Sequence, residues 1–464
     1  MKLLQKGAFA EKKVPMLLLL AVGIIEFLFI TLESRFSGIA YYLAETYVIV
    51  PCLLLLGYGL REKPGTFARR RLLLAAAAIS WFVIVQCIHK LLGMENHPLG
   101  TVFLVYLMAF PFASLADDRE NWGLYGIGGM CVAASLVLVA HTLLLVLGWV
   151  PAGMEGVLYW DGARLHALWH PNINACYFMI GMGFSAAFCA QAKKAWAKGL
   201  LLAAIAVQFV AMALTNCRTV ILITGALLGG IAFFRIFRGN WTQLVLGLLA
   251  AAVLLVGSFK LSGMLYQWNN DRLVAAYMAA QEEAVPVETQ PAEASSASEA
   301  PAVDRAGMIS GDNGQGTLSD DMRTLNGRTL IWKAALETVR DNKQLALWGT
   351  EYSGTVISAG RGWSLVHAHN SWMETLMRMG LPGLAMALVF TALSVWSAAK
   401  LLLRQDTQLW KKIIAMTTMC LLVAGFLEPY LFITNVYYHV MDFMFFFCTG
   451  YLDYWSNRKQ EQTV

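Results

Sequence analysis

The residues of this sequence with the clearest capacity for chemistry lie in the run from His367 to Ser371. Ser371 is followed three positions later by Glu374, which is the spacing of a capping box, so we predict that a helix begins here. A neutral imidazole beside a helix start can accept a proton from a hydroxyl, and the free N–H groups there favour an anion. His369 is therefore a candidate general base, with His367 and Asn370 as candidate substrate contacts. The alternative is that both histidines are solvated loop residues.

Four arginines form a second set of candidates. They lie at the ends of apolar runs or in the long polar segment before His369: Arg164, Arg218, Arg328 and Arg361. An arginine near hydrocarbon costs about 2.5–3.5 kcal/mol on insertion scales, so one kept at an outer span end indicates an anionic partner. The guanidinium group suits phosphate, which it can bind through two parallel hydrogen bonds. The alternative is that these side chains only reach toward lipid headgroups.

Two further polar positions belong with these candidates. Asn172 follows Arg164 at the entry to an apolar run, and Glu428 with Pro429 marks an outer turn that could face the same site. The sequence contains no P-loop, no His-Glu-x-x-His, no Asp-x-Asp, no Gly-x-Ser-x-Gly and no clustered Cys/His spacing. We therefore expect chemistry without ATP, metal or another cofactor. It would need a pre-activated substrate whose leaving group the arginines can stabilise.

The composition indicates an integral membrane protein. Of the 464 residues, 58% are hydrophobic and 14% are charged, and the mean hydropathy is +0.56. These values exclude a soluble enzyme, a disordered chain and a fibrous protein. The net charge of 35 − 30 = +5 is spread over short connectors, so nucleic acid is not an expected partner. The eight cysteines form no C-x-x-C and lie in or beside apolar runs, where we interpret them as packing residues.

Twelve apolar runs are long enough to span a bilayer. They lie near residues 14–32, 40–60, 72–92, 99–116, 122–150, 171–191, 199–216, 218–237, 241–259, 381–399, 412–428 and 433–452. The Lys and Arg residues are concentrated in every second connector. Because positively charged connectors remain on the cytoplasmic side, both termini are predicted to be cytoplasmic. The fold class expected is thus an all-α polytopic membrane protein with about twelve transmembrane helices and one large, partly helical extracytoplasmic loop before the tenth span.

This pattern divides the chain into four regions. Residues 1–259 hold nine spans, and residues 260–370 form the extracytoplasmic loop, whose acidic linker at 281–303 is expected to be disordered. Residues 371–454 comprise an interfacial helix, ended by Gly380, and three spans. Residues 455–464 form a cytoplasmic tail. A helix is also predicted over residues 326–339 within the loop.

Four stretches resemble the bacterial O-antigen ligase and O-antigen polymerase superfamily of membrane-embedded, lipid-linked glycan transferases. They are His369-Asn370 with Gly380-Leu381-Pro382-Gly383, Arg328 with Trp332, Leu214-Thr215-Asn216-Cys217-Arg218, and Arg164 with His170-Pro171-Asn172. Cys217 stands where the family usually has Ser.

The resemblance implies a glycosyltransferase of the bacterial cytoplasmic (inner) membrane that needs no cofactor. Its donor would be a glycan on an undecaprenyl diphosphate carrier, and its acceptor a hydroxyl of a glycan, lipid or protein outside the membrane. By resemblance, His369 would be the base, and Arg218 and Arg328, with Arg164, would bind the diphosphate. We prefer the ligase over the repeat-unit polymerase on the motif set. A transporter or lipid flippase, and a scaffold for surface-polymer assembly, stay open as alternatives. No internal repeat supports the transporter.

Overall fold

The fold described here is that of a computed structural model. It describes residues 17, 20–21, 23–24, 27, 66–94, 110, 120–147, 159–160, 164–165, 170–283, 328–350, 357–358, 364–365, 368–432 and 439–457. Eight helices within these ranges are long and apolar enough to cross a membrane. The chain is an all-α polytopic membrane protein, as its composition predicts.

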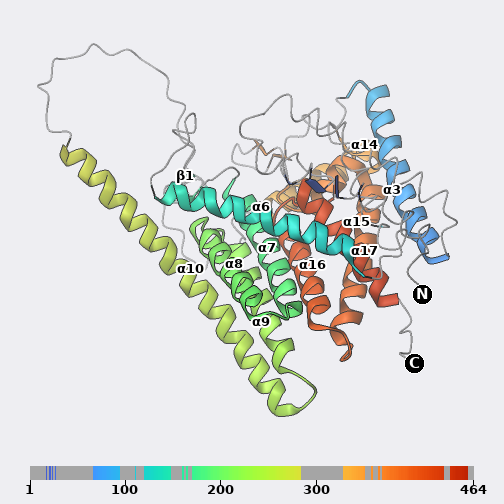
Figure 1. The fold of residues 1–464 in the computed structure, drawn as a ribbon. Helices are drawn as coiled ribbons and strands as arrows, with labels where there is room; N and C mark the ends of the chain where they lie inside the picture. The colour runs from blue at the N-terminus through green and yellow to red at the C-terminus, as the bar shows by residue number, and fades with distance from the viewer. Residues whose placement is uncertain are drawn as a thin grey trace, which may run out of the picture.

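The helices follow one another along the chain in a single bundle (Figure 1). They are α3 (Thr66–Leu91), α6 (Trp122–Val146), α7 (Pro171–Gln191), α8 (Ala195–Leu214), α9 (Arg218–Ile236), α10 (Trp241–Glu283), α13 (Arg328–Asp341), α14 (Lys343–Trp348), α15 (Ser371–Leu403), α16 (Leu409–Leu427) and α17 (His439–Asn457). Two antiparallel pairs of two-residue strands complete the description: β1 (Tyr159–Trp160) with β2 (Arg164–Leu165), and β3 (Ile357–Ser358) with β4 (Ser364–Leu365).

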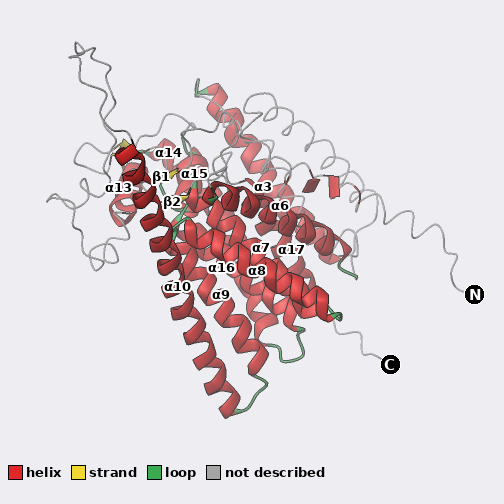
Figure 2. Cartoon of the chain, turned by 60° about the vertical axis from the view of Figure 1, so that its left-hand side comes forward, coloured by secondary structure: helices red, strands yellow, loops and turns green. Residues whose placement is uncertain are grey.

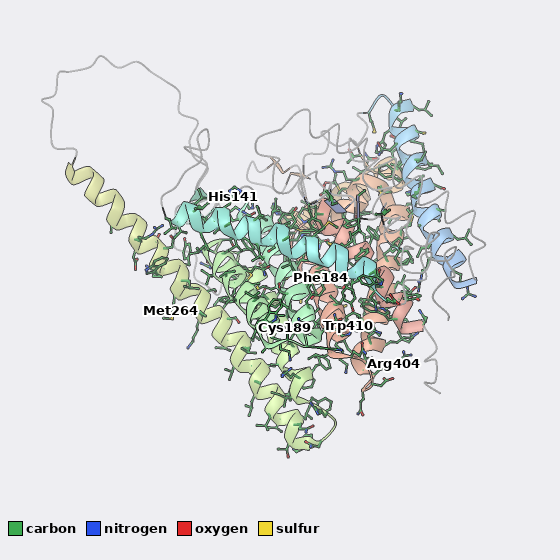
Figure 3. All side chains as sticks on the ribbon, viewed as in Figure 1. His141, Phe184, Cys189, Met264, Arg404 and Trp410 are labelled. Atoms are coloured by element: carbon green, nitrogen blue, oxygen red, sulfur yellow. The ribbon has the colours of Figure 1, made fainter. Side chains whose placement is uncertain are left out.

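The middle of the bundle is formed by α7, α16 and α17. In the apolar 18-residue stretch of each helix, 83% of the α7 residues are buried inside the protein, compared with 11% of the α10 residues. We therefore expect α10 to face lipid over most of its surface. The aromatic run Phe445–Phe447 of α17 is fully buried. In Figure 3, Phe184 and Trp410 lie among the central helices, whereas Met264 projects from the outer side of α10.

Six of the predicted spans coincide with α3, α6, α7, α8, α9 and α16 to within a few residues. The run predicted at 433–452 corresponds to α17, which is described from His439 onward. The run at 40–60 lies outside the described residues, and so do all of 99–116 except residue 110 and all but a few residues of 14–32. The count of twelve therefore stays a prediction.

One helix, α10, differs from what the sequence predicts, whereas the predicted break in α15 is confirmed. We expected the ninth span to end near residue 259, but α10 continues to Glu283 over 43 residues. Its continuation is rich in Ala, Leu, Met and Gln and contains no proline before residue 286, so no residue there ends the helix. The predicted interfacial helix and the tenth span follow one another within α15, and the predicted break between them is present. The break lies at Gly380, which has φ 68° and ψ −170°.

Contacts between distant residues show which helix ends share a side of the membrane. Arg71 at the start of α3 forms a buried ion pair with Asp453 near the end of α17. The Trp455 indole of α17 donates to Asn121, directly before α6. At the opposite end of α3, His89 lies 3.0 Å from the carbonyl oxygen of Trp348 in α14. Figure 2 shows α13, α14, β1 and β2 gathered at that end of the bundle, where the polar candidates meet.

Candidate active site

The start of α15 positions His369. Asn370 is the N-cap, and its side-chain oxygen accepts hydrogen bonds from the backbone N–H groups of Trp372 and Met373. The capping box predicted for Ser371 and Glu374 is therefore wrong, because the chain turns into the helix one residue earlier and asparagine caps a helix as well as serine does. The Ser371 hydroxyl instead donates to the carbonyl of Glu428, at 3.1 Å. The Asn370 side chain thus hydrogen-bonds to backbone groups, and its amide also donates to the Phe426 carbonyl.

His369 itself has a left-handed backbone, with φ 48°. This conformation is uncommon for a residue other than glycine and costs on the order of 1–3 kcal/mol unless its surroundings enforce it. The ring nitrogen Nδ1 lies 3.1 Å from Oε2 of Glu428. The side chain is 15% exposed, so the imidazole is largely enclosed.

Glu428 is the centre of the polar cluster. It is the C-cap residue of α16, and its carboxylate contacts three side chains from three other elements. Oε2 faces His369, whereas Oε1 accepts hydrogen bonds from Asn172, at 3.1 Å, and from Arg328. Burial alone would raise the pKa of Glu428, but the hydrogen bond and charge of His369 and the charge of Arg328 lower this pKa to about 2. The carboxylate is therefore ionised at any physiological pH.

Arg328 is the first residue of α13, the helix predicted in the external loop. One guanidinium nitrogen, Nη2, forms the ion pair with Glu428. The Nε–H is buried and has no hydrogen-bond partner among the residues that the structure describes. Trp332, one turn later on the same face, packs edge-to-face on Phe426 at 5.2 Å between ring centroids. Its indole N–H is likewise buried and has no partner within the described ranges.

Arg164 and Asn172 join the same cluster through a chain of hydrogen bonds. Arg164, on β2, donates from Nε to the Thr215 carbonyl at 3.0 Å and from Nη2 to Asn172 at 2.7 Å. Asn172 lies in the first turn of α7, which His170 caps and Pro171 opens, as suits a helix start. Its amide group then donates to Glu428. Asn172 therefore links the Arg164 guanidinium to the central carboxylate.

Arg218 opens α9 at the edge of the cluster. Its predecessor, Cys217, is buried and is the N-cap of the helix. Burial raises the pKa of the Cys217 thiol to about 11. Arg164 donates to the carbonyl of Thr215, three residues before Arg218, and this contact places the start of α9 beside the cluster. The Arg218 side chain is exposed.

The structure thus brings His369, Arg328, Arg164 and Asn172 together around one carboxylate, with Arg218 at the border. His367 and Arg361 lie outside the described residues. Glu428 was predicted only as an outer turn that could face the site, and the structure places its carboxylate against His369, Arg328 and Asn172. A charged residue at the end of an apolar run is costly to bury unless it has a partner. The position of Glu428 at the end of such a run is the feature of the sequence that could have identified it as a site residue. No group of three or more His, Cys, Asp and Glu side chains that could hold a metal occurs in the described part of the chain.

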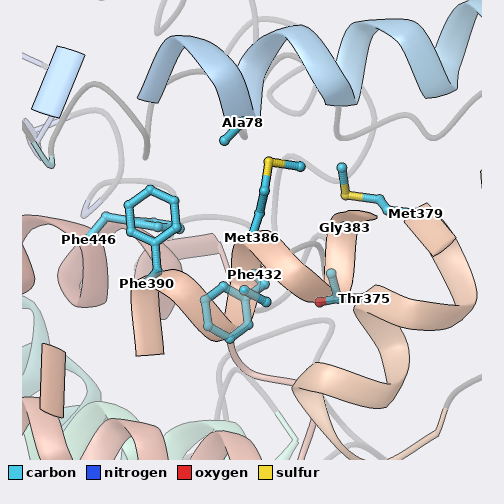
Figure 4. Close-up of a pocket in the computed structure, with 9 residues that line it drawn as sticks. Ala78, Thr375, Met379, Gly383, Met386, Phe390, Phe432 and Phe446 are labelled. Atoms are coloured by element: carbon cyan, nitrogen blue, oxygen red, sulfur yellow. The ribbon is translucent and has the colours of Figure 1, made fainter. Parts of the chain in front are cut away.

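A small apolar pocket lies between α3 and α15 (Figure 4). It is lined by residues of α3, α15 and α17 together with Phe432, and Thr375 is its one polar contributor: Ala78, Thr375, Met379, Gly383, Met386, Ala387, Phe390, Phe432 and Phe446. The Thr375 hydroxyl already donates to the Ser371 carbonyl at 2.7 Å.

Comparison with protein-family models gives a match for part of the chain. Residues 200–388 match the family model described as O-Antigen ligase. The matched segment runs from α8 into α15 and contains Arg218, Arg328 and His369, whereas Arg164, Asn172 and Glu428 lie outside it. A search of curated proteins found no match. Over residues 200–388, this membrane protein is therefore similar to the O-antigen ligase family.

Proposed function

We propose that the protein is an O-antigen ligase-like glycosyltransferase. It transfers a glycan from an undecaprenyl diphosphate carrier to an acceptor hydroxyl on the outer face of the bacterial cytoplasmic membrane, without a metal. The observation that carries this proposal is the carboxylate of Glu428, which contacts His369 through one oxygen and Arg328 through the other. A proton acceptor and a diphosphate-binding cation are thereby held side by side.

His369 acts as the general base. When Nδ1–H is donated to Glu428, Nε2 carries the lone pair of the neutral imidazole, and this nitrogen accepts the proton of the acceptor hydroxyl. The acceptor oxygen forms the new bond to the anomeric carbon as the bond between that carbon and the diphosphate oxygen breaks. The negative Glu428 carboxylate stabilises the imidazolium that results.

Arg328 stabilises the leaving group. The electron pair of the broken bond goes to the diphosphate, and a cation already in place there lowers the barrier because it needs no reorganisation. Its buried Nε–H, which has no partner among the described residues, supports this role, since an unmade hydrogen bond costs about 1–3 kcal/mol. Arg218, whose side chain is exposed at the border of the cluster, provides a second cation for the diphosphate.

Arg164 and Asn172 have a different role from the direct substrate contact that their positions in the sequence predict. Arg164 donates to the Thr215 carbonyl and to Asn172, and Asn172 donates to Glu428. We assign this pair to holding the Glu428 carboxylate in place. The acceptor decides between a ligase, which uses a different molecule, and a polymerase, which extends glycans on the same carrier.

The test is transfer in vitro from a defined polyprenyl diphosphate-linked glycan by the purified protein in detergent, with a chelator present. His369→Ala is expected to lower turnover by about 10²–10⁴-fold, the usual contribution of a general base. The matched control, His141→Ala, removes a histidine from α6 and is expected to retain activity. Full activity of His369→Ala, or loss of activity with chelator alone, would refute the proposal.

A further inference from the structure

A buried ion pair lies one turn beyond His369 and has no place in the mechanism above. Glu374 and Arg378 are four residues apart on α15, and Arg378 Nε lies 3.0 Å from Glu374 Oε1. Their side chains are 8% and 5% exposed. A buried ion pair rarely stabilises a fold more than apolar residues of the same size would, so its presence calls for another explanation.

The second carboxylate oxygen of Glu374 makes a contact that explains the ion pair. Oε2 accepts a hydrogen bond of 2.8 Å from the backbone N–H of Ala368, which is fully buried. Ala368 directly precedes His369. On the other side, the Asn370 amide is held by the Phe426 carbonyl at 2.8 Å. His369 is therefore clamped between two fixed neighbours.

This clamp explains how His369 keeps its left-handed backbone. A φ of 48° is unfavourable for histidine and persists only where the surroundings enforce it. The direction of the imidazole toward Glu428 depends on that backbone conformation, because the ring is attached to it by one side-chain carbon. Releasing Ala368 would let residue 369 relax into an ordinary conformation and turn the ring away.

We propose that Glu374, with its charge balanced by Arg378, is a positioning residue that fixes the backbone of His369 and so aims its imidazole. The inference rests on the proposed role of His369 as the base. Two donors, the Ala368 N–H and the Arg378 guanidinium, converge on one carboxylate. Glutamine at this position offers one acceptor oxygen and one NH₂ group, so one of the two donors would face another donor.

The test measures transfer kinetics and melting temperature for two variants. Glu374→Gln is isosteric and is expected to lower kcat about 10- to 100-fold while the KM for the donor changes less than about twofold, because misplacing a base slows chemistry without weakening binding. The double variant Glu374→Arg with Arg378→Glu restores an ion pair but not the hydrogen bond to Ala368. We expect the double variant to have a melting temperature close to that of the wild type but a kcat that stays below the wild-type value.

A purely structural pair predicts the opposite, that the swapped variant regains wild-type kcat, and this outcome would overturn the inference. Wild-type kcat in Glu374→Gln, or a rise in donor KM as large as the fall in kcat, would overturn it as well. If the swapped protein does not fold, the Glu374→Gln kinetics decide alone. The outcome is separable from failure of the proposed function, since that failure would appear as an inactive wild type or as a fully active His369→Ala in the same assay.

Discussion

At the scale of single residues, Glu428 organises the candidate site. Its carboxylate joins side chains of α7, α13 and the start of α15, and it is buried with them. His369 and Arg328 could be predicted because each stands in a short motif. The role of Glu428 could not, since it lies 59 and 100 residues from those two partners and only the folded chain brings them together.

Replacing this carboxylate tests its role in orienting the base. We expect Glu428→Gln to lower kcat about 10²–10⁴-fold, because an amide neither selects the productive histidine tautomer nor stabilises the imidazolium. The measurement is transfer of glycan at saturating donor. The control Glu337→Gln changes an exposed glutamate on α13 and is expected to retain activity. Equal activity of Glu428→Gln and wild type would contradict the assigned role.

The stability of the protein toward acid provides a second test at this scale. The pKa of Glu428 is lowered from 4.5 to about 2 in the folded protein. A lowered pKa means that the carboxylate stabilises the fold above the unfolded value and that this contribution is lost as pH falls through the folded value. We therefore expect the melting temperature in detergent to decrease between pH 5 and pH 2, and Glu428→Gln to flatten that decrease. An unchanged slope would show that other groups dominate.

At the scale of elements, two glycines join the external helices to α15. Gly349, after α14, has φ 73°, and Gly380, at the break in α15, has φ 68°. The Thr350 N–H donates to the Met377 carbonyl at 2.8 Å beside them. The loop helices and the helix that follows His369 are therefore packed backbone against backbone.

A methyl group at this contact should disturb both stability and catalysis. In Gly349→Ala the new Cβ would lie 2.2 Å from the carbonyl carbon of Arg378, so backbone must shift. We expect a loss of at least about 1–3 kcal/mol in stability, measured by thermal unfolding, with reduced transfer because α13 carries Arg328. Gly257→Ala, on the open face of α10, is the control and should be neutral or slightly stabilising. Tolerance of both changes alike would argue against this packing.

The aromatic cluster around Phe426 allows a matched pair of substitutions. Trp332 has a buried N–H with no partner in the described residues, whereas the Trp372 N–H donates to Thr391 at 2.9 Å. Both rings pack on Phe426. If the Trp332 N–H donates a hydrogen bond to the lipid-linked substrate, Trp332→Phe should raise the dissociation constant for undecaprenyl diphosphate about 5- to 20-fold, the effect of one lost hydrogen bond. Trp372→Phe should leave it unchanged, and identical effects of the two would reject this role for Trp332.

Several element boundaries could be predicted because single residue types dictate them. The break at Gly380 follows from glycine's access to positive φ, and the start of α7 from Pro171. The end of α10 could not be predicted, because no residue type marks it. Residues 260–283 leave the apolar region but keep high helix propensity, and hydropathy alone does not report where a helix stops.

At the scale of the whole molecule, apolar runs predicted the membrane class and most of the helices, but not their arrangement. Helix pairing depends on side-chain contacts between distant segments, such as the ion pair of Arg71 with Asp453. Such contacts carry no local signal in a single sequence. They nevertheless agree with the predicted alternation, since the starts of α3 and α6 and the end of α17 share one side of the bundle.

The absolute orientation follows from the proposed function and can be measured. We expect the candidate site to face outward and the turn between α9 and α10 to face the cytoplasm. In a cysteine-free background, Lys343→Cys should react with a membrane-impermeant maleimide in intact cells, and Arg238→Cys only after permeabilisation. Both positions are exposed. Labelling in the reverse order would invert the topology and remove the acceptor hydroxyl from the proposed compartment.

The dispersal of the cluster along the chain has a consequence for biogenesis. Its side chains are synthesised over a long interval of the chain, from Arg164 to Glu428. Until α16 is inserted, the imidazole lacks its carboxylate and Arg328 lacks its counter-ion. A chain synthesised only as far as α15 therefore lacks the assembled cluster, and we expect the proposed transfer to begin only after α16 and Glu428 have been inserted.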